Sequence, residues 1–328
     1  WAKAFRVIGA SYVYGVAKWH DGFCYWDTDT TTYKSQNDYI GQLIKACQNN
    51  GLRFVFYFNH HTEGNPEWEH TQLHDKTGKP YRSGYPFPKH TVYSEFRQFT
   101  LSQIQELLTK YGRVDGIWLD HFREITDVSD GVVHEAFEEM LGYPLRDADI
   151  TEQREFSARS LAAYLQDIAK IAEDTKQDSF LITMNGGLRY SSPGDSYTKF
   201  IGAWIDYPSQ EGHYIPRLEE RVRRGGLIGK PLDIGVKFNE SWHVIPGYEN
   251  PLILNKDQAI AISSMALFHA SSLWLGMIPD YDGSFGPNME LAQHVGEWFR
   301  TVRPHLDGIE PYRDVGFLMG NPNFYCSR

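Results

Sequence analysis

The sequence predicts an α/β protein built on a (β/α)8 TIM-like barrel, and two observations carry that prediction. Short apolar runs alternate with helical patterns along the 328 residues, as repeated right-handed βαβ units require. Polar and titratable residues directly follow the apolar runs, and a barrel gathers such groups at the carboxyl ends of its strands. An open dinucleotide-binding sheet is disfavoured because no G-x-G-x-x-G follows a strand, and MNGGLR (184–189) lacks that spacing.

Buried parallel strands are expected wherever a short run is almost wholly apolar. The seven expected strands are 11–18, 52–59, 115–120, 179–185, 200–207, 231–238 and 271–278. Gly51 and Gly112 should end the first two of the intervening helices, since glycine is common just past a helix C-terminus. The expected helices are 38–49, 95–111, 156–174, 216–224, 256–270 and 289–303.

Seven strands are one fewer than a closed barrel of this type needs. Because the sequence opens inside an apparent helix, WAKAF, we expect the first barrel strand to lie before residue 1. Residues 1–310 are therefore predicted to form an N-terminally incomplete barrel, and 311–328 to begin a further C-terminal domain or a trailing segment. The polar, turn-rich segment 61–92 is expected to form an elaborated loop over the barrel mouth, and 123–155 a second insertion.

The composition narrows the classes of partner. Net charge is −10 and the pI is near 5.7, which argues against nucleic acid and against anionic membrane surfaces. No apolar run reaches the length of a membrane span. Three scattered cysteines form neither a disulfide framework nor a zinc pattern, and they favour a reducing, cytoplasmic compartment. A homo-oligomer is left open.

The segment AKWHDGFCYW, residues 17–26, is unusually rich in large and polar side chains. Amphipathic rings beside charges suit a sugar, because a pyranose has apolar C–H faces and a rim of hydroxyls. Trp19, His20 and Trp26 are therefore candidate sugar-binding residues. Asp21 and Gly22 fit a tight turn at least as well as any chemical role.

Asp120 ends an otherwise apolar strand, where an ionised carboxylate is costly unless it is paired or functional. Trp118 points to the same side of that strand and could form a stacking wall beside it. The alternative is a structural aspartate that caps the next helix or pairs with Arg123. Glycoside chemistry needs a second carboxylate, for which Glu211 and Glu240 are the candidates, although either could be a solvated loop residue.

A catalytic metal is disfavoured although the chain has 13 histidines. His60 and His61 are adjacent, so on a strand they would point to opposite sides. His70 and His74 have the spacing of a helical pair, but Thr71 stands where a zinc peptidase carries its glutamate. A serine triad is disfavoured too, since no G-x-S-x-G occurs. We expect no metal and no cofactor.

Four segments resemble a known family in the same order along the chain. AKWHDGFCYWDTDTT resembles the AKHHDGF-x-x-W signature of the α-L-fucosidases of glycoside hydrolase family twenty-nine. YGRVDGIWLD resembles that family's YG-x-x-D-x-x-W-x-D, whose final Asp is the nucleophile. DYPSQE has the spacing of its D-F-x-T-x-E stretch, and FNESWHV resembles its N-D-S-W-G-Y segment. The related family one hundred and fifty-one is an equally good match.

The resemblance implies a retaining, exo-acting hydrolase of fucosylated or similar oligosaccharides that works through a glycosyl-enzyme ester. Asp120 would be the nucleophile and Glu211 the acid/base, with Glu240 as the alternate acid. The resemblance and the positions at strand ends together give the expected substrate-binding residues. These are His20, Trp19, Trp26, Tyr57, His60, Trp118, Asn185 and Trp242.

The departures from the family pattern keep other substrates and another class open. Trp19 stands where the family has the first histidine of its pair, so one hydroxyl contact is replaced by a stacking surface. An α-L-galactoside or α-L-glucoside is therefore an alternative substrate. A non-catalytic carbohydrate-binding barrel and a metal-dependent hydrolase are the alternatives from other classes.

Overall fold

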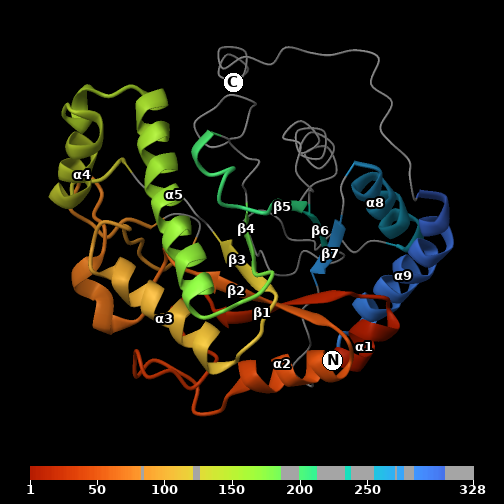
Figure 1. Ribbon diagram of the computed structural model, residues 1–328. Coiled ribbons are helices and arrows are strands. Elements are labelled where there is room, and N and C mark those ends of the chain that lie inside the picture. The colour runs from red at the N-terminus through yellow and green to blue at the C-terminus, as the bar shows by residue number, and fades with distance from the viewer. Residues whose placement is uncertain are drawn as a thin grey trace, which may run out of the picture.

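The computed structural model describes residues 1–82, 85–120, 126–185, 199–212, 233–237, 255–269, 272–276 and 284–306 (Figure 1). A seven-stranded sheet lies at its centre, and the spatial order of the strands follows their order in the chain. Every neighbouring pair is parallel. The strands are β1 (Tyr12–Lys18), β2 (Arg53–Asn59), β3 (Gly116–Asp120), β4 (Leu181–Asn185), β5 (Tyr207–Gly212), β6 (Asp233–Lys237) and β7 (Ser272–Gly276).

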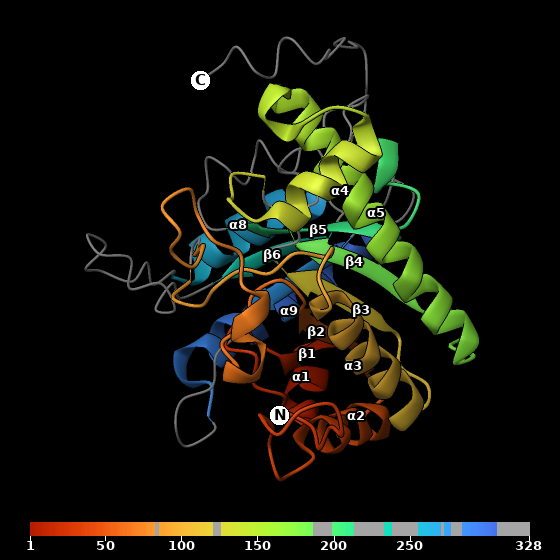
Figure 2. The same cartoon turned by 90° about the vertical axis from the view of Figure 1, so that its left-hand side faces the viewer.

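Helices alternate with the strands and lie around the outside of the curved sheet (Figures 1 and 2). One flank carries α2, α3 and α5, and the other carries α8 and α9 beside α1. The helices are α1 (Ala2–Val7), α2 (Tyr39–Asn49), α3 (Phe96–Lys110), α4 (Gly131–Leu141), α5 (Ile150–Asp174), α8 (Lys256–His269) and α9 (Gly286–Leu306), with short 3₁₀ helices η1 (Pro66–Thr71) and η2 (Leu145–Asp147).

The sheet curls until side chains from distant strands meet inside it. Tyr12 of β1 donates its hydroxyl to Asp233 of β6 over 2.8 Å, and Tyr14 donates to the same carboxylate over 2.6 Å. The Tyr14 and Tyr207 hydroxyls lie 3.1 Å apart. Burial raises the pKa of Asp233, and its hydroxyl donors oppose that shift. These contacts across the interior are those of a barrel wall, so the predicted α/β barrel class is confirmed.

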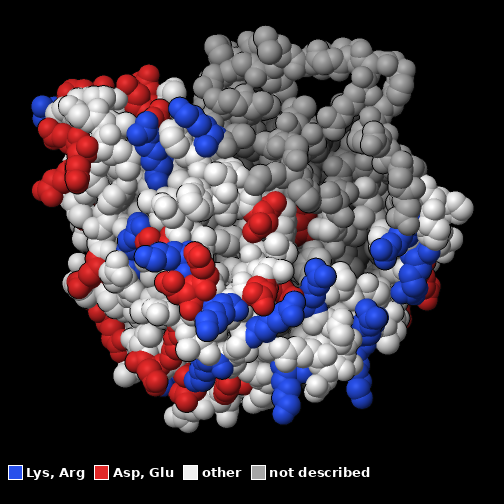
Figure 3. Space-filling model, viewed as in Figure 1, with Lys and Arg blue, Asp and Glu red and all other residues white. Residues whose placement is uncertain are grey.

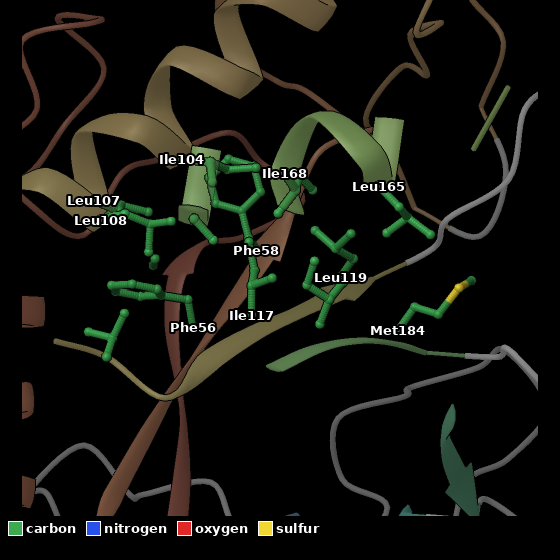
Figure 4. Packing of buried hydrophobic residues seen from close by; sticks show 14 of the residues in the cluster. Phe56, Phe58, Ile104, Leu107, Leu108, Ile117, Leu119, Leu165, Ile168 and Met184 are labelled. Atoms are coloured by element: carbon green, nitrogen blue, oxygen red, sulfur yellow. The ribbon is translucent and has the colours of Figure 1, made fainter. Parts of the chain in front are cut away.

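Successive strand residues alternate between the barrel interior and the helix layer. On β2, Phe56 and Phe58 face outward into the main core, whereas Tyr57 joins an inner cluster of aromatic residues. Figure 4 shows outward residues of β2, β3 and β4 beside α3 and α5. The labelled contacts come from Phe56, Phe58, Ile117, Leu119 and Met184 of the strands and from Ile104, Leu107, Leu108, Leu165 and Ile168 of the helices.

One predicted strand is misplaced. Residues 201–204 form turns, and β5 begins only at Tyr207. The apolar side chains of Ile201 and Ile205 pack into the main core from this turn, with the Ile205 N–H donating to the Ile201 carbonyl over 3.3 Å. The true strand, YPSQEG, looks polar because its inner face meets a polar interior, where Ser209 donates to Asp233 over 3.3 Å.

The remaining expected elements agree with the structure, or fall outside its described part. The helix predicted at 156–174 begins earlier, at Ile150, because Asp149 and Glu152 form a reciprocal capping box. Within the expected insertion 123–155, α4 packs on α5 through a small apolar cluster that includes Phe137. The helix predicted at 216–224 and the segment 311–328 lie outside the described residues.

Acidic and basic side chains are interspersed over much of the face in Figure 3, as on an ordinary solvated helical surface. Cys24 and Cys47 are buried free thiols. None of the helices in the described ranges combines the length and apolarity that a membrane crossing demands.

Candidate active site

Asp120 is the last residue of β3 and is 3% exposed. The strand register sets it opposite Asn59, at the carboxyl end of β2. Tyr57 donates its hydroxyl to Oδ2, Asn185 Nδ2 donates to Oδ1 over 2.7 Å, and His20 Nε2 lies 3.2 Å from Oδ2. Hydrogen bonds to the ionised form offset the desolvation of a buried carboxylate, so these side chains hold Asp120 in one orientation.

His20 is fully buried and is enclosed on several sides. Its ring stacks on Tyr85, with centroids 3.6 Å apart and planes 21° apart. Its Nδ1 contacts Asn59 Nδ2, and its Nε2 lies 3.3 Å from the Tyr57 hydroxyl. Asn59 and Tyr85 were not among the site residues predicted from the sequence. The position of Asn59 at the end of a strand indicates a place in the site. Tyr85 has no such mark, because it is one of several aromatic residues in 61–92.

A wall of aromatic rings borders these polar groups. Tyr57 lies between Trp118, at a centroid distance of 5.0 Å, and Trp19, at 5.1 Å, and both pairs are stacked. Trp274 of β7 meets the edge of Trp118 at 6.2 Å, and Tyr14 of β1 lies 5.8 Å from it. The stacked rings combine apolar faces with nearby hydrogen-bonding groups, which is the surface that a pyranose requires.

The loop that carries Trp19 and His20 is anchored by a fully buried ion pair. A register irregularity at the end of β1 accompanies the burial of Lys18, whose Nζ lies 2.6 Å from Glu63 Oε2 and donates to Gln103 Oε1 over 3.1 Å. Burial raises the pKa of Glu63, and the attraction of Lys18 opposes that shift. The ammonium also faces the rings of Phe58, Phe96 and Phe99 at 5.5, 5.3 and 4.8 Å.

Gly22 is the residue that lets this loop close over Glu63. Its φ is +83°, and a Cβ on it would lie 1.2 Å from Glu63 Oε1. The Asp21 carbonyl accepts from Gly64 N over 3.0 Å, and its side chain accepts from Phe23 N over 3.0 Å. The predicted turn at Asp21 and Gly22 is therefore present, and it ties the loop that holds His20 to the segment that follows β2.

The substitution Gly22→Ala is expected to lower the free energy of unfolding by about 3 kcal/mol, because it adds a steric clash to an unfavourable backbone conformation. Gly51→Ala is the matched control, since Gly51 also has a positive φ, +66°, but has open space around its Cβ position. We expect it to lose about 1 kcal/mol. Urea denaturation measures both, and equal losses would show that Glu63 does not constrain Gly22.

Two predicted sugar-binding residues lie in other surroundings. Trp26 is fully buried in the core between the sheet and the helices, and its indole N–H donates to Glu106 of α3 over 3.0 Å. The His60 ring stacks on Tyr164 of α5 at a centroid distance of 4.9 Å. Burial lowers the pKa of His60 well below its usual value. Asn59 faces His20 instead, because adjacent strand residues point to opposite faces.

Of the two candidate acids, the structure gives the backbone position of Glu211 and does not describe Glu240. Glu211 was expected just beyond a strand, but it lies within β5, where its backbone pairs with Gly235 of β6. Glu240, Trp242 and Arg123 lie outside the described residues. Within the described ranges, no group of three or more His, Cys, Asp or Glu side chains could hold a metal ion.

Comparison with known proteins gives a family model and several relatives. A model of the family described as alpha-L-fucosidase matches residues 1–301. Alpha-L-fucosidase 1 of Arabidopsis thaliana is 30% identical over 128 residues, which are 37% of this chain and 21% of that protein. A putative alpha-L-fucosidase 1 of Oryza sativa subsp. japonica is 29% identical over 132 residues, or 37% of this chain and 20% of that protein.

Solved structures share the fold. Alpha-L-fucosidase isoenzyme 2 from Paenibacillus thiaminolyticus superposes with a TM-score of 0.74 at 14% identity, over 93% of this chain and 46% of that one. The Thermotoga maritima alpha-fucosidase in complex with fucose gives a TM-score of 0.55 at 20% identity, over 95% of this chain and 57% of that one. The chain thus corresponds to about half of these two proteins, while its alignments with the curated plant relatives span about a fifth of their length.

Proposed function

Because the chain belongs to the α-L-fucosidase family, we propose that it is the barrel of an exo-acting, retaining glycoside hydrolase that releases L-fucose from α-L-fucosides. The observation that carries the proposal is Asp120, a buried carboxylate at a strand end that accepts hydrogen bonds from Tyr57 and Asn185 beside an aromatic wall. A structural aspartate needs neither the wall nor that position on the barrel.

In the proposed reaction, an Asp120 oxygen attacks the anomeric carbon as the bond to the leaving-group oxygen breaks. A carboxylic acid donates its proton to that oxygen, so the first step yields a glycosyl ester and the free aglycone alcohol. The same residue, now a carboxylate, then removes a proton from water, which attacks the anomeric carbon. The ester is cleaved, Asp120 is released, and the sugar keeps its anomeric configuration.

Glu211 is the proposed acid/base, with Glu240 as the alternate. The backbone register supports Glu211, which lies two residues after Ser209 in β5. Ser209 pairs in turn with Asn185, whose amide binds Asp120. A retaining mechanism requires the two carboxyl groups to stand about 5–5.5 Å apart across the pocket.

The aromatic wall favours binding of fucose over related sugars that carry an additional hydroxyl group. Fucose carries a methyl group where an L-galactoside carries a hydroxymethyl group, and a buried aromatic surface penalises the unpaired hydroxyl. Trp19, Tyr57 and Trp118 form one stacked series, so the site offers that surface beside the polar side chains of His20 and Asn185.

Hydrolysis of p-nitrophenyl α-L-fucoside by the full-length protein tests the proposal. We expect turnover, a first-formed α-L-fucose by NMR, and a rate about 10- to 100-fold above those for the α-L-galactoside and α-L-glucoside. A first-formed β-anomer would mean inversion, and faster cleavage of another glycoside would mean a different sugar. Binding without turnover would mean a non-catalytic barrel, and a rate abolished by EDTA would mean a metal-dependent hydrolase.

A further inference from the structure

Asn59 is a fully buried side chain whose orientation the backbone determines. Its Oδ1 accepts hydrogen bonds from the N–H groups of His61 and Thr62, each over 3.0 Å. A backbone N–H can only donate, so the atom facing these two groups must be the amide oxygen. The amide NH₂ group is therefore the part of Asn59 that faces Nδ1 of His20.

That orientation determines where His20 carries its proton. An NH₂ group offers only hydrogens, so Nδ1 of His20 must present a lone pair, and the proton of the neutral ring then lies on Nε2. Nε2 lies 3.2 Å from Asp120 Oδ2. Tyr57 donates its hydroxyl to the same oxygen. With its proton on Nε2, His20 presents an N–H within donor distance of Oδ2.

We propose that Asn59 is a positioning residue that holds His20 as the neutral tautomer with its proton on Nε2. The proposal rests on the proposed role of Asp120 as nucleophile. A neutral donor orients a carboxylate without placing a full positive charge beside it, so Asp120 keeps its negative charge available for the anomeric carbon. An imidazolium in the same place would form a charge-assisted bond that opposes attack.

Aromatic rings and a carboxylate enclose the His20 ring. Tyr85 covers one face of the ring, and Trp19 meets it with centroids 4.9 Å apart and planes at 73°. The carboxylate of Asp120 lies 3.2 Å from Nε2 of His20. The hydroxyl of Tyr57 lies 3.3 Å from the same nitrogen. The amide of Asn59 thus decides which nitrogen of His20 meets Asp120.

Nitrogen-15 NMR of the full-length protein labelled at histidine tests the tautomer directly. The signals that disappear in His20→Gln identify His20 among the 13 histidines. We expect a protonated Nε2 and an unprotonated Nδ1 at neutral pH. A proton on Nδ1, or on both nitrogens, would overturn the proposal. No substrate is needed, so this result is independent of whether the chain hydrolyses a fucoside.

The substitution Asn59→Asp tests the role of the amide. It keeps the acceptor for the backbone N–H groups but places a second acceptor against Nδ1, so we expect His20 to become doubly protonated. The kcat for the aryl fucoside should fall about 10- to 100-fold, with a smaller change in KM. An unchanged His20 signal would overturn the role of Asn59. If the variant does not fold, the spectrum of the unsubstituted protein still decides the tautomer.

Asn65→Asp is the matched control because it makes the same exchange at another buried asparagine of this segment. The Asn65 side chain accepts from Glu67 N over 3.1 Å and donates to Thr31 over 2.9 Å. We expect the His20 signals of this variant to match those of the unsubstituted protein. A change there equal to that in Asn59→Asp would show a general effect of added charge and overturn the specific one.

Discussion

Asp120→Ala is expected to lower kcat for p-nitrophenyl α-L-fucoside on the order of 10⁴-fold, because the substitution removes the proposed nucleophile. Added azide should restore turnover and give β-L-fucosyl azide. The donors that now bind the carboxylate, Tyr57 and Asn185, would face the anion in the space that the side chain leaves. Rates and the configuration of the product are measured together.

Asp115→Ala is the control for this variant, because Asp115 directly precedes the same strand at its opposite end. Its carboxylate accepts from Phe54 N over 2.8 Å, a contact that fastens β3 to β2. We expect this variant to lose stability, to keep kcat per folded molecule and to gain nothing from azide. An Asp120→Ala enzyme that stays within about tenfold of the original, or an α-configured azide product, would remove Asp120 from the nucleophile's role.

The strand ends are predictable from sequence because burial leaves a clear pattern there. Runs such as RFVFYFN and GIWLD are apolar on both faces, since one face meets the helices and the other meets aromatic residues inside the barrel. A carboxylate that ends such a run is conspicuous, and so Asp120 is found. The run at 200–207 is also mostly apolar, but its apolar residues lie in and beside a turn that packs on the core.

Side-chain partners across the chain are not predictable in this way. Trp26 and Trp19 both belong to an aromatic-rich loop, but Trp26 packs in the main core and donates to the distant Glu106 on α3, whereas Trp19 stacks on Tyr57. Tyr85 reaches His20 from a segment with no periodic pattern. The orientation of Asn59 depends on two backbone N–H groups that become donors to it only once the chain turns after β2.

Lys18→Met is expected to lower the free energy of unfolding by about 3–5 kcal/mol, because it leaves the Glu63 carboxylate buried without its cation. Methionine retains most of the length of the lysine side chain. The loss of stability therefore measures the removal of the charge more than a change in packing. The variant should also weaken catalysis, because the loop that presents His20 is fastened through this pair. Urea denaturation measures the stability, and kcat/KM is measured on the folded variant.

Two further variants separate the ion pair from a general effect of removing a lysine. In Lys18→Met/Glu63→Gln both charges are gone, so the loss should shrink to less than about 2 kcal/mol, and the double-mutant cycle should show a large coupling energy. Lys34→Met breaks a pair with Asp27, 2.8 Å apart, that water screens, and should cost much less than Lys18→Met. A Lys18→Met loss no greater than that of Lys34→Met would mean that the buried pair does not hold the His20 loop.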